Sequence, residues 1–280
     1  MKQNTIALGE KHLEGDYHRI LAAGDIWLKD SKTKSIYTAG DIDIENSCIR
    51  KIYSAGDLTA KAVTIGLGKV AGDLTLQGIC KVDKLIVVGD ISAEYLECTC
   101  LRNGSNNSKV NNTLHWSGFI KAETFESVAP FLLDLDYEFA TMIISGPLVA
   151  TEEIACTNFY GLDQITAPCI NADLIYLLTN DGTEVGELVG SSITIETKFK
   201  PDKIFKSIPK TLRYNDLYSD KSLITIEAIS SDKVIINSVK ANSVSGIDVV
   251  IGDLCIVDEV VYQKSIKISD KAVVGRVVKQ

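Results

Sequence analysis

The residues of this chain that could bind a metal or take part in catalysis are few and widely spaced. The 280 residues include seven cysteines and three histidines. A structural zinc site takes four Cys or His ligands, usually in close pairs, yet only Cys98 and Cys100 are close together, with His115 the histidine nearest them. Cys48 and Cys80 each follow a recurring glycine by eight residues, and Cys98 follows one by nine. We therefore expect these three cysteines to fill one interior row as small apolar groups, and we predict no metal site.

The sequence gives equally little support for a nucleophilic, phosphate-binding or glycosidase site. The Gly-x-Ser-x-Gly motif is absent, and residues 65–69, Ile-Gly-Leu-Gly-Lys, lack the full phosphate-loop spacing. Two carboxylate pairs are candidates for a polysaccharide-cleaving β-helix, namely Asp134 with Asp136 and Asp258 with Glu259. Aromatic residues, which line such clefts, make up only 7% of the chain. We predict that the protein is not an enzyme and has no catalytic residue and no cofactor, with a polysaccharide-active β-helix enzyme as the least favoured alternative.

A repeated phrase defines the elements that carry these residues. Two small or apolar residues, then Gly-Asp, then Ile or Leu recur around glycines 16 or 17 residues apart, at Gly24, Gly40, Gly56, Gly72 and Gly89. Apolar residues alternate around each copy, which is typical of half-buried strands. A fixed short period on β-branched residues indicates a solenoid whose coils stack on one another. The predicted fold is therefore an all-β solenoid, a β-helix of about 16–17 residues per coil.

Each Gly-Asp pair is expected at a corner between strands. The glycine suits a corner that needs positive φ or close backbone approach. The aspartate can accept a hydrogen bond from a backbone amide in the turn. Alternatively, the stacked aspartates could hold a row of cations.

The regular pattern is interrupted twice. We predict β-helix coils over 1–102, a loop and helical insertion over 103–140, and a continuation of the β-helix over 141–280 with a basic loop at 198–220. The helix is expected within 121–139, where apolar residues recur. The basic loop interleaves aromatic residues with Lys198, Lys200, Lys203, Lys206, Lys210 and Arg213. It is either a solvated loop or a contact for an anionic partner.

Composition and charge indicate a cytoplasmic protein without a nucleic-acid partner. The formal net charge of −8 argues against a nucleic acid bound through a general basic surface. No window approaches the roughly 18 unbroken apolar residues of a membrane span, and the first residues do not form a secretory signal. The odd number of cysteines shows no secreted-type disulfide framework. Membrane association is left open but is not indicated.

Two parts of the chain resemble the bactofilin family. One is the segment 13–20, Leu-Glu-Gly-Asp-Tyr-His-Arg-Ile, before a Gly-Asp-Ile coil, and the other is the strand-rich tail. The likeness covers roughly residues 13–100 and 223–280. It implies a right-handed β-helix that polymerises end to end without nucleotide, as a cytoskeletal scaffold for cell-envelope or morphogenetic proteins. The chain departs from the usual family pattern of one compact helix with disordered Pro-rich tails, because its middle carries two insertions.

The expected function is that of a non-enzymatic structural or scaffold protein whose partner is itself, as a homopolymer or homo-oligomer. An uncovered solenoid end presents an unpaired strand edge and an apolar layer. The candidate self-association residues are Val273, Val274, Val277 and Val278. The alternative is a non-polymerising β-solenoid binding module whose inserted loops dock a partner.

Overall fold

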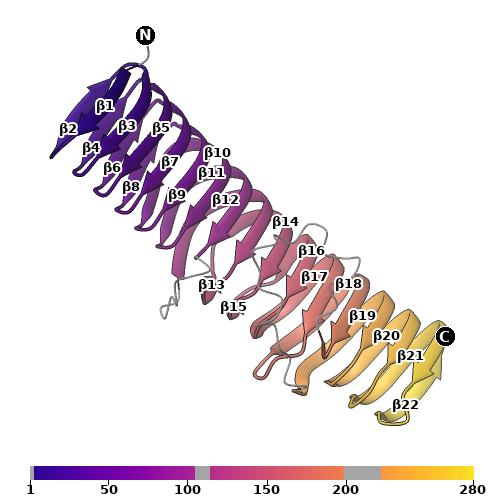
Figure 1. Ribbon diagram of the computed structural model, residues 1–280. Coiled ribbons are helices and arrows are strands. Elements are labelled where there is room, and N and C mark those ends of the chain that lie inside the picture. Colours follow the sequence, from indigo (N-terminus) through magenta and orange to yellow (C-terminus); the bar gives the residue numbers. More distant parts are fainter. Residues whose placement is uncertain (1–2, 105–113, 199–221) are drawn as a thin grey trace. The chain divides into compact units, whose positions relative to one another are not determined.

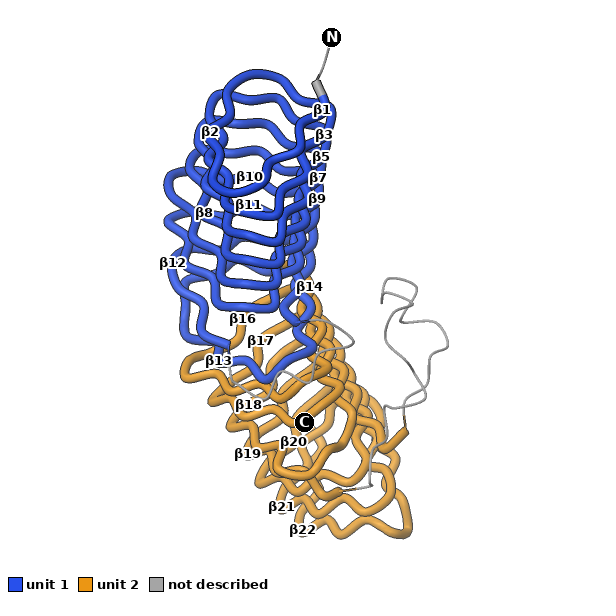
Figure 2. Tube along the Cα trace, turned by 60° about the vertical axis from the view of Figure 1, so that its left-hand side comes forward, with its two compact units in different colours: residues 1–139 blue, residues 140–280 orange. Residues whose placement is uncertain are grey.

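The chain folds as a β-solenoid. The computed structural model describes residues 3–104, 114–198 and 222–280, and none of these residues is helical. Its parallel strands stack as the repeat predicted (Figure 1), and they make about 15 turns. The chain divides into two compact units, residues 1–139 and 140–280, which are coloured separately in Figure 2.

Thirteen of the described strands lie entirely within the first unit. These are β1 (Gln3–Ala7), β2 (Lys11–Glu14), β3 (Tyr17–Ala22), β4 (Ile26–Lys29), β5 (Lys32–Thr38), β6 (Ile42–Glu45), β7 (Cys48–Ser54), β8 (Leu58–Lys61), β9 (Thr64–Val70), β10 (Leu74–Val87), β11 (Ile91–Asn103), β12 (Leu114–Ser127) and β13 (Phe131–Leu133). The boundary between the units falls within β14 (Asp136–Ile144).

Each coil of the first unit adds one residue to every interior row. Ile20, Ile36 and Ile52 pair in register in β3, β5 and β7, and all three are fully buried. Burying such a side chain contributes roughly 1.5–3 kcal/mol relative to leaving it exposed. Because side chains alternate across a strand, a one-residue slip would turn the whole row outward. The 16-residue period therefore places the same residue types at the same interior position in successive coils.

The helix expected within 121–139 is wrong, because the described residues there form strands. β12 pairs with β11 in register as a further coil. Every second residue along this stretch is buried, at Phe125, Ser127, Ala129, Phe131 and Leu133. Ser127 and Ala129 are not large apolar residues, so the sequence did not show the period of two. Because apolar residues also occur at the partly exposed positions between the buried ones, the spacing resembled that of a helix.

The expected interior row of three cysteines is also wrong. Cys48 is exposed, whereas Cys80 and Cys98 are buried in different rows, in register with Leu96 and Val82 respectively. The reason is a bulge in β10, where the 17-residue coil accommodates its additional residue. The added residue moves Cys80 and the rest of that coil to the other face of the strand. Cys98 belongs to the next coil and lies one position beyond the row of Cys48, which continues through Lys81 and Glu97.

The second unit is built in the same way from longer strands. After the end of β14 it contains β15 (Leu148–Ala150), β16 (Ile154–Gly161), β17 (Ile165–Leu178), β18 (Glu184–Glu196), β19 (Ile224–Ile236), β20 (Val239–Ile251), β21 (Ile256–Ile268) and β22 (Val273–Lys279). One interior row runs in register from β16 to β22, through Ile154, Ile170, Leu188, Ile229, Val244, Val260 and Val277. The last member of this row lies in the terminal coil.

Candidate interaction surfaces

The Gly-Asp corners of the first unit link each coil to the next. The Asp57 amide donates to the Asp41 carboxylate at 2.8 Å, and the Asp73 amide donates to the Asp57 carboxylate at 2.8 Å. The same bond joins Asp41 to Asp25 at 3.0 Å and Asp90 to Asp73 at 2.9 Å. The prediction that these aspartates accept a backbone amide is confirmed, but the amide belongs to the following coil. Within the described residues, no group of three or more His, Cys, Asp or Glu side chains is arranged to hold a metal ion.

Close approach, and not positive φ, explains the repeated glycine. A Cβ on Gly56 would lie 2.3 Å from the Asp41 Oδ1 and 2.8 Å from the carbonyl carbon of Gly40. Gly72 and Gly89 meet the same obstruction from the preceding aspartate. Since real Cβ atoms do not approach other atoms so closely, glycine and aspartate form one unit in which the carboxylate occupies the space of the missing side chain.

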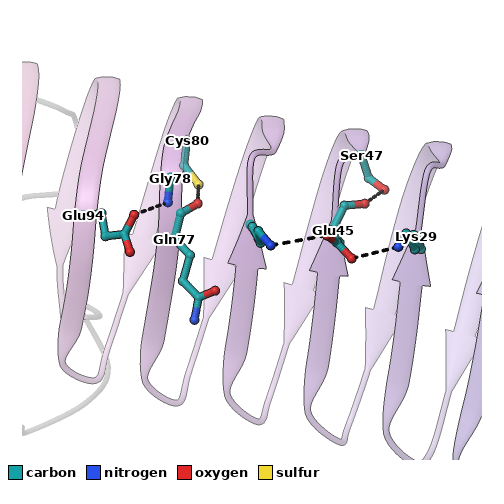
Figure 3. Close-up of polar contacts among 8 residues, drawn as sticks. Lys29, Glu45, Ser47, Gln77, Gly78, Cys80 and Glu94 are labelled. Atoms are coloured by element: carbon teal, nitrogen blue, oxygen red, sulfur yellow. Dashed lines mark hydrogen bonds and ion pairs between the residues drawn. The ribbon is translucent and has the colours of Figure 1, made fainter.

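A ladder of alternating charge lies on the face formed by β2, β4, β6 and β8. Glu14, Lys29, Glu45 and Lys61 occupy equivalent positions in successive coils. The Glu45 carboxylate is 3.2 Å from the Lys29 Nζ (Figure 3) and 3.5 Å from the Lys61 Nζ. The hydrogen bond and charge of Lys29 lower the pKa of Glu45 below its ordinary value, and Glu45 in turn raises the pKa of Lys29. Exposed pairs of this kind add little to stability.

The ladder borders a hollow of about 350 Å³ on the same face. Its lining includes His12, Trp27, Asp43 and Thr59, which form the neighbouring outward row of the same strands. The rings of His12 and Trp27 are stacked, with centroids 4.8 Å apart and planes 20° apart. The hollow therefore has an aromatic and acidic row on one side and the charged ladder on the other. It combines concavity, an aromatic ring and several polar groups.

A buried ion pair lies at the far end of the first unit, where Arg102 in β11 is in register with Glu126 in β12. The Arg102 Nη1 is 3.6 Å from the Glu126 Oε1, and the two side chains are only 10% and 2% exposed. Burial raises the pKa of Glu126, although the nearby Arg102 acts in the opposite direction. Breaking such a pair leaves a buried charge uncompensated, so the pair joins these two coils.

The four candidate self-association residues all lie in β22, where the structure separates them by orientation. Val277 extends the row of Val260, which is fully buried, and yet Val277 is 46% exposed. Val274 extends the row of Val257 and is partly exposed. Val273 is 64% exposed, and Val278 is partly exposed. Val274 and Val277 thus belong to the apolar layer of the terminal coil.

The candidate partner loop falls largely outside the described residues. Lys198 is described and is exposed. The other five residues, Lys200, Lys203, Lys206, Lys210 and Arg213, lie outside the described residues. Residues 105–113 of the expected first insertion also lie outside them. No helix among the described residues is long and apolar enough to span a membrane.

All seven cysteines are free thiols in the structure. Burial raises the pKa of Cys98 to about 12, so its thiol is protonated at neutral pH. The Cys98 Sγ donates to the backbone carbonyl of Cys100 at 3.1 Å. Cys98 therefore acts as a small buried core residue.

Comparison with known proteins found no matching family model, no matching curated protein and no matching solved structure. The candidate surfaces consequently rest on the residues and geometry described above.

Sequence reasoning did not find the hollow beside Trp27. A signal for it was present, because His12, Trp27 and Asp43 are spaced by 15 and 16 residues, close to one coil. Aligning the coils by their Gly-Asp phrase would have placed Trp27, Asp43 and Thr59 in one row, each three residues after the glycine, whereas the coil of His12 carries Gly9-Glu10 instead. What the spacing could not reveal is that this row borders a concave surface.

Proposed function

We propose that this protein is a non-enzymatic cytoplasmic scaffold of the bactofilin type, which associates with further copies of itself through the terminal coil of its second unit. Cell-envelope or morphogenetic proteins are the partners that such a scaffold would localise. The proposal rests on one observation, the exposure of interior-row side chains in the last two strands.

In the last two strands, the final side chains of two interior rows are exposed. Val260 is fully buried, whereas its register partner Val277 is 46% exposed. Ile251 is 1% exposed, whereas its partner Ile268 is 40% exposed. These side chains occupy positions that the next coil covers everywhere earlier in the row. A further layer of apolar side chains would bury them in the same way.

The backbone of β22 supports the same conclusion. Among the described residues, β22 pairs with β21 alone. An edge strand with free amide and carbonyl groups is a template for another strand. A second copy that adds a strand here would satisfy these groups while covering Val274 and Val277. Backbone pairing and apolar burial therefore favour the same contact.

The experiment compares wild-type protein with Val277→Asp by sedimentation velocity across a range of concentrations. We expect wild-type protein to form larger species as concentration rises, and Val277→Asp to remain a single small species, because a carboxylate would be buried in the contact. Val149→Asp is the matched control, since Val149 is an exposed valine of the same unit, at 45% exposure, but lies in β15. Circular dichroism verifies that both variants are folded.

The proposal fails if wild-type protein stays monomeric at all concentrations. It also fails if Val277→Asp associates as strongly as wild-type protein and Val149→Asp.

A further inference from the structure

The hollow on the first unit arises from a sharp change of side-chain size along one outward row. His12 and Trp27 are large rings, and the next two members of the row are the much shorter Asp43 and Thr59. Neighbouring parallel strands are about 4.8 Å apart, so the short residues form a step beside the indole, and the row continues with the equally short Thr75 and Ser92. All four residues line the hollow of about 350 Å³. This volume lies at the lower end of the range typical of small-molecule sites.

One face of the Trp27 ring is available to a ligand in this step. His12 stacks on the opposite face, from the preceding coil, and so holds the ring in place. Asp43, in the following coil, is too short to cover the rest of the indole. An apolar, fixed aromatic face therefore forms one wall of the hollow.

Hydrogen-bonding groups lie around this aromatic wall. Within the described part of the chain, neither the Trp27 Nε1–H nor the Asp43 carboxylate has a hydrogen-bond or ion-pair partner, so a donor and an acceptor are left for a ligand. On the other side, Lys29 and Lys61 both contact Glu45, which holds their ammonium groups beside the hollow. Each ammonium has three N–H donors and does not use all of them on one carboxylate.

The charges of the lining are mixed. Two lysines, Lys29 and Lys61, stand beside three carboxylates, Glu14, Asp43 and Glu45. An anionic ligand would meet the carboxylates, and a cationic ligand would meet the ammonium groups. A neutral ligand with many hydroxyl groups can donate to the carboxylates and accept from the lysines and the indole. Its apolar ring face can pack against Trp27.

We propose that this hollow binds a neutral oligosaccharide, with one sugar ring packed against Trp27 and its hydroxyl groups donating to Asp43. The site is independent of the terminal coil of the second unit. It gives the scaffold a lateral surface for a carbohydrate and requires no chemical step.

Tryptophan fluorescence offers a direct readout, because the chain has only two tryptophans. Trp27 is partly exposed in the hollow, whereas Trp116 is 4% exposed in the core. The full chain is titrated with a panel of neutral oligosaccharides: cello-, xylo-, malto-, laminari- and chito-oligosaccharides of four to six units. We expect at least one to change the emission of Trp27 and to give a saturable heat in isothermal titration calorimetry.

Two variants then test the assignment. Trp27→Ala should weaken calorimetric binding by at least tenfold, and Asp43→Ala should weaken it by a similar factor. Tyr53→Ala is the matched control, because Tyr53 is a partly exposed aromatic residue stacked on Tyr37 in the same unit, outside the hollow, and should bind as wild type does. Circular dichroism verifies that the variants are folded.

The proposal is overturned if no oligosaccharide of the panel binds at millimolar concentration. It is equally overturned if the Trp27→Ala variant binds the sugar as tightly as wild-type protein. Tetramethylammonium serves as a cationic probe of the same aromatic face, and its binding at the hollow without binding of any sugar would also overturn the proposal.

Discussion

The backbone amide of Asp57 donates a hydrogen bond of 2.8 Å to the carboxylate of Asp41, which lies sixteen residues earlier in the chain. The sixteen-residue period of the sequence therefore corresponds to one coil of the stack. Each carboxylate satisfies a corner amide of the next coil, at a place where strand pairing is interrupted. The bond can form only if the coils are in register, so the repeated aspartate specifies the register of the first unit.

The first prediction concerns this bond. Asp57→Ala removes the acceptor for the Asp73 amide, and we expect a loss of about 1 kcal/mol in the free energy of unfolding, because the corner is exposed. Asp57→Asn retains a side-chain oxygen and should lose less. Urea denaturation measures both, with Asp83→Ala, an exposed carboxylate of the same unit outside this ladder, as control. An equal loss in all three variants would contradict the role given to the ladder.

The second prediction compares two glycines with different constraints. Gly56→Ala would place its Cβ 2.3 Å from the Asp41 Oδ1, and we expect a loss of about 2–3 kcal/mol from overpacking. Gly78 has φ of +65°, and a methyl group there would meet no other atom within 4 Å, so Gly78→Ala should cost only the conformational strain of roughly 1–2 kcal/mol. Urea denaturation of the two variants gives the order. A larger loss for Gly78→Ala would show that close approach does not limit the repeat.

The third prediction concerns the pKa of Glu45, which Lys29 lowers more than Lys61 does. Lys29→Gln should raise this pKa toward its ordinary value, and Lys61→Gln should raise it less, as measured by NMR titration of the Glu45 carboxyl carbon. Because the pKa is lower in the folded state, the interaction stabilises the fold above the ordinary pKa. This stabilisation is lost as pH falls through the lowered value. Equal shifts in the two variants would contradict the geometry of the ladder.

The fourth prediction concerns the reactivity of the cysteines. Cys48 is exposed, whereas Cys98 is buried and has its pKa raised to about 12 by burial. Because the thiolate is the reactive form, iodoacetamide at pH 8 should modify Cys48 in the native protein well before Cys98. Peptide mass spectrometry after brief labelling measures both sites, and labelling in urea serves as the fully reactive reference. Comparable native rates at the two sites would contradict the burial of Cys98.

The repeat predicted the solenoid because Gly-Asp corners and alternating apolar residues recur in successive coils and can be recognised within a short segment of sequence. It did not predict the strands at 125–133, since Ser127 and Ala129 fill interior positions that pattern reading reserves for larger apolar residues. It also misplaced Cys80, because one added residue in a bulge changes the face of every position that follows in the same coil. Both errors concern which residues face the interior of the coil, because small interior residues and bulges are hard to recognise in a sequence.

The candidate surfaces were less accessible to prediction. Val277 was named from the sequence as a candidate self-association residue, and the structure places it in β22 with 46% exposure. The hollow beside Trp27 depends on the difference in length between neighbours in one row, which appears only when the coils are aligned in space. Concavity of this kind is a property of stacking and not of any single segment.

Negative-stain electron microscopy of the full chain, without nucleotide and at physiological salt, tests self-association through the terminal coil most directly. We predict assemblies longer than a single chain for wild-type protein, and single particles for Val277→Asp under the same conditions. Uniform single particles for wild-type protein, or unchanged assemblies for Val277→Asp, would contradict the account.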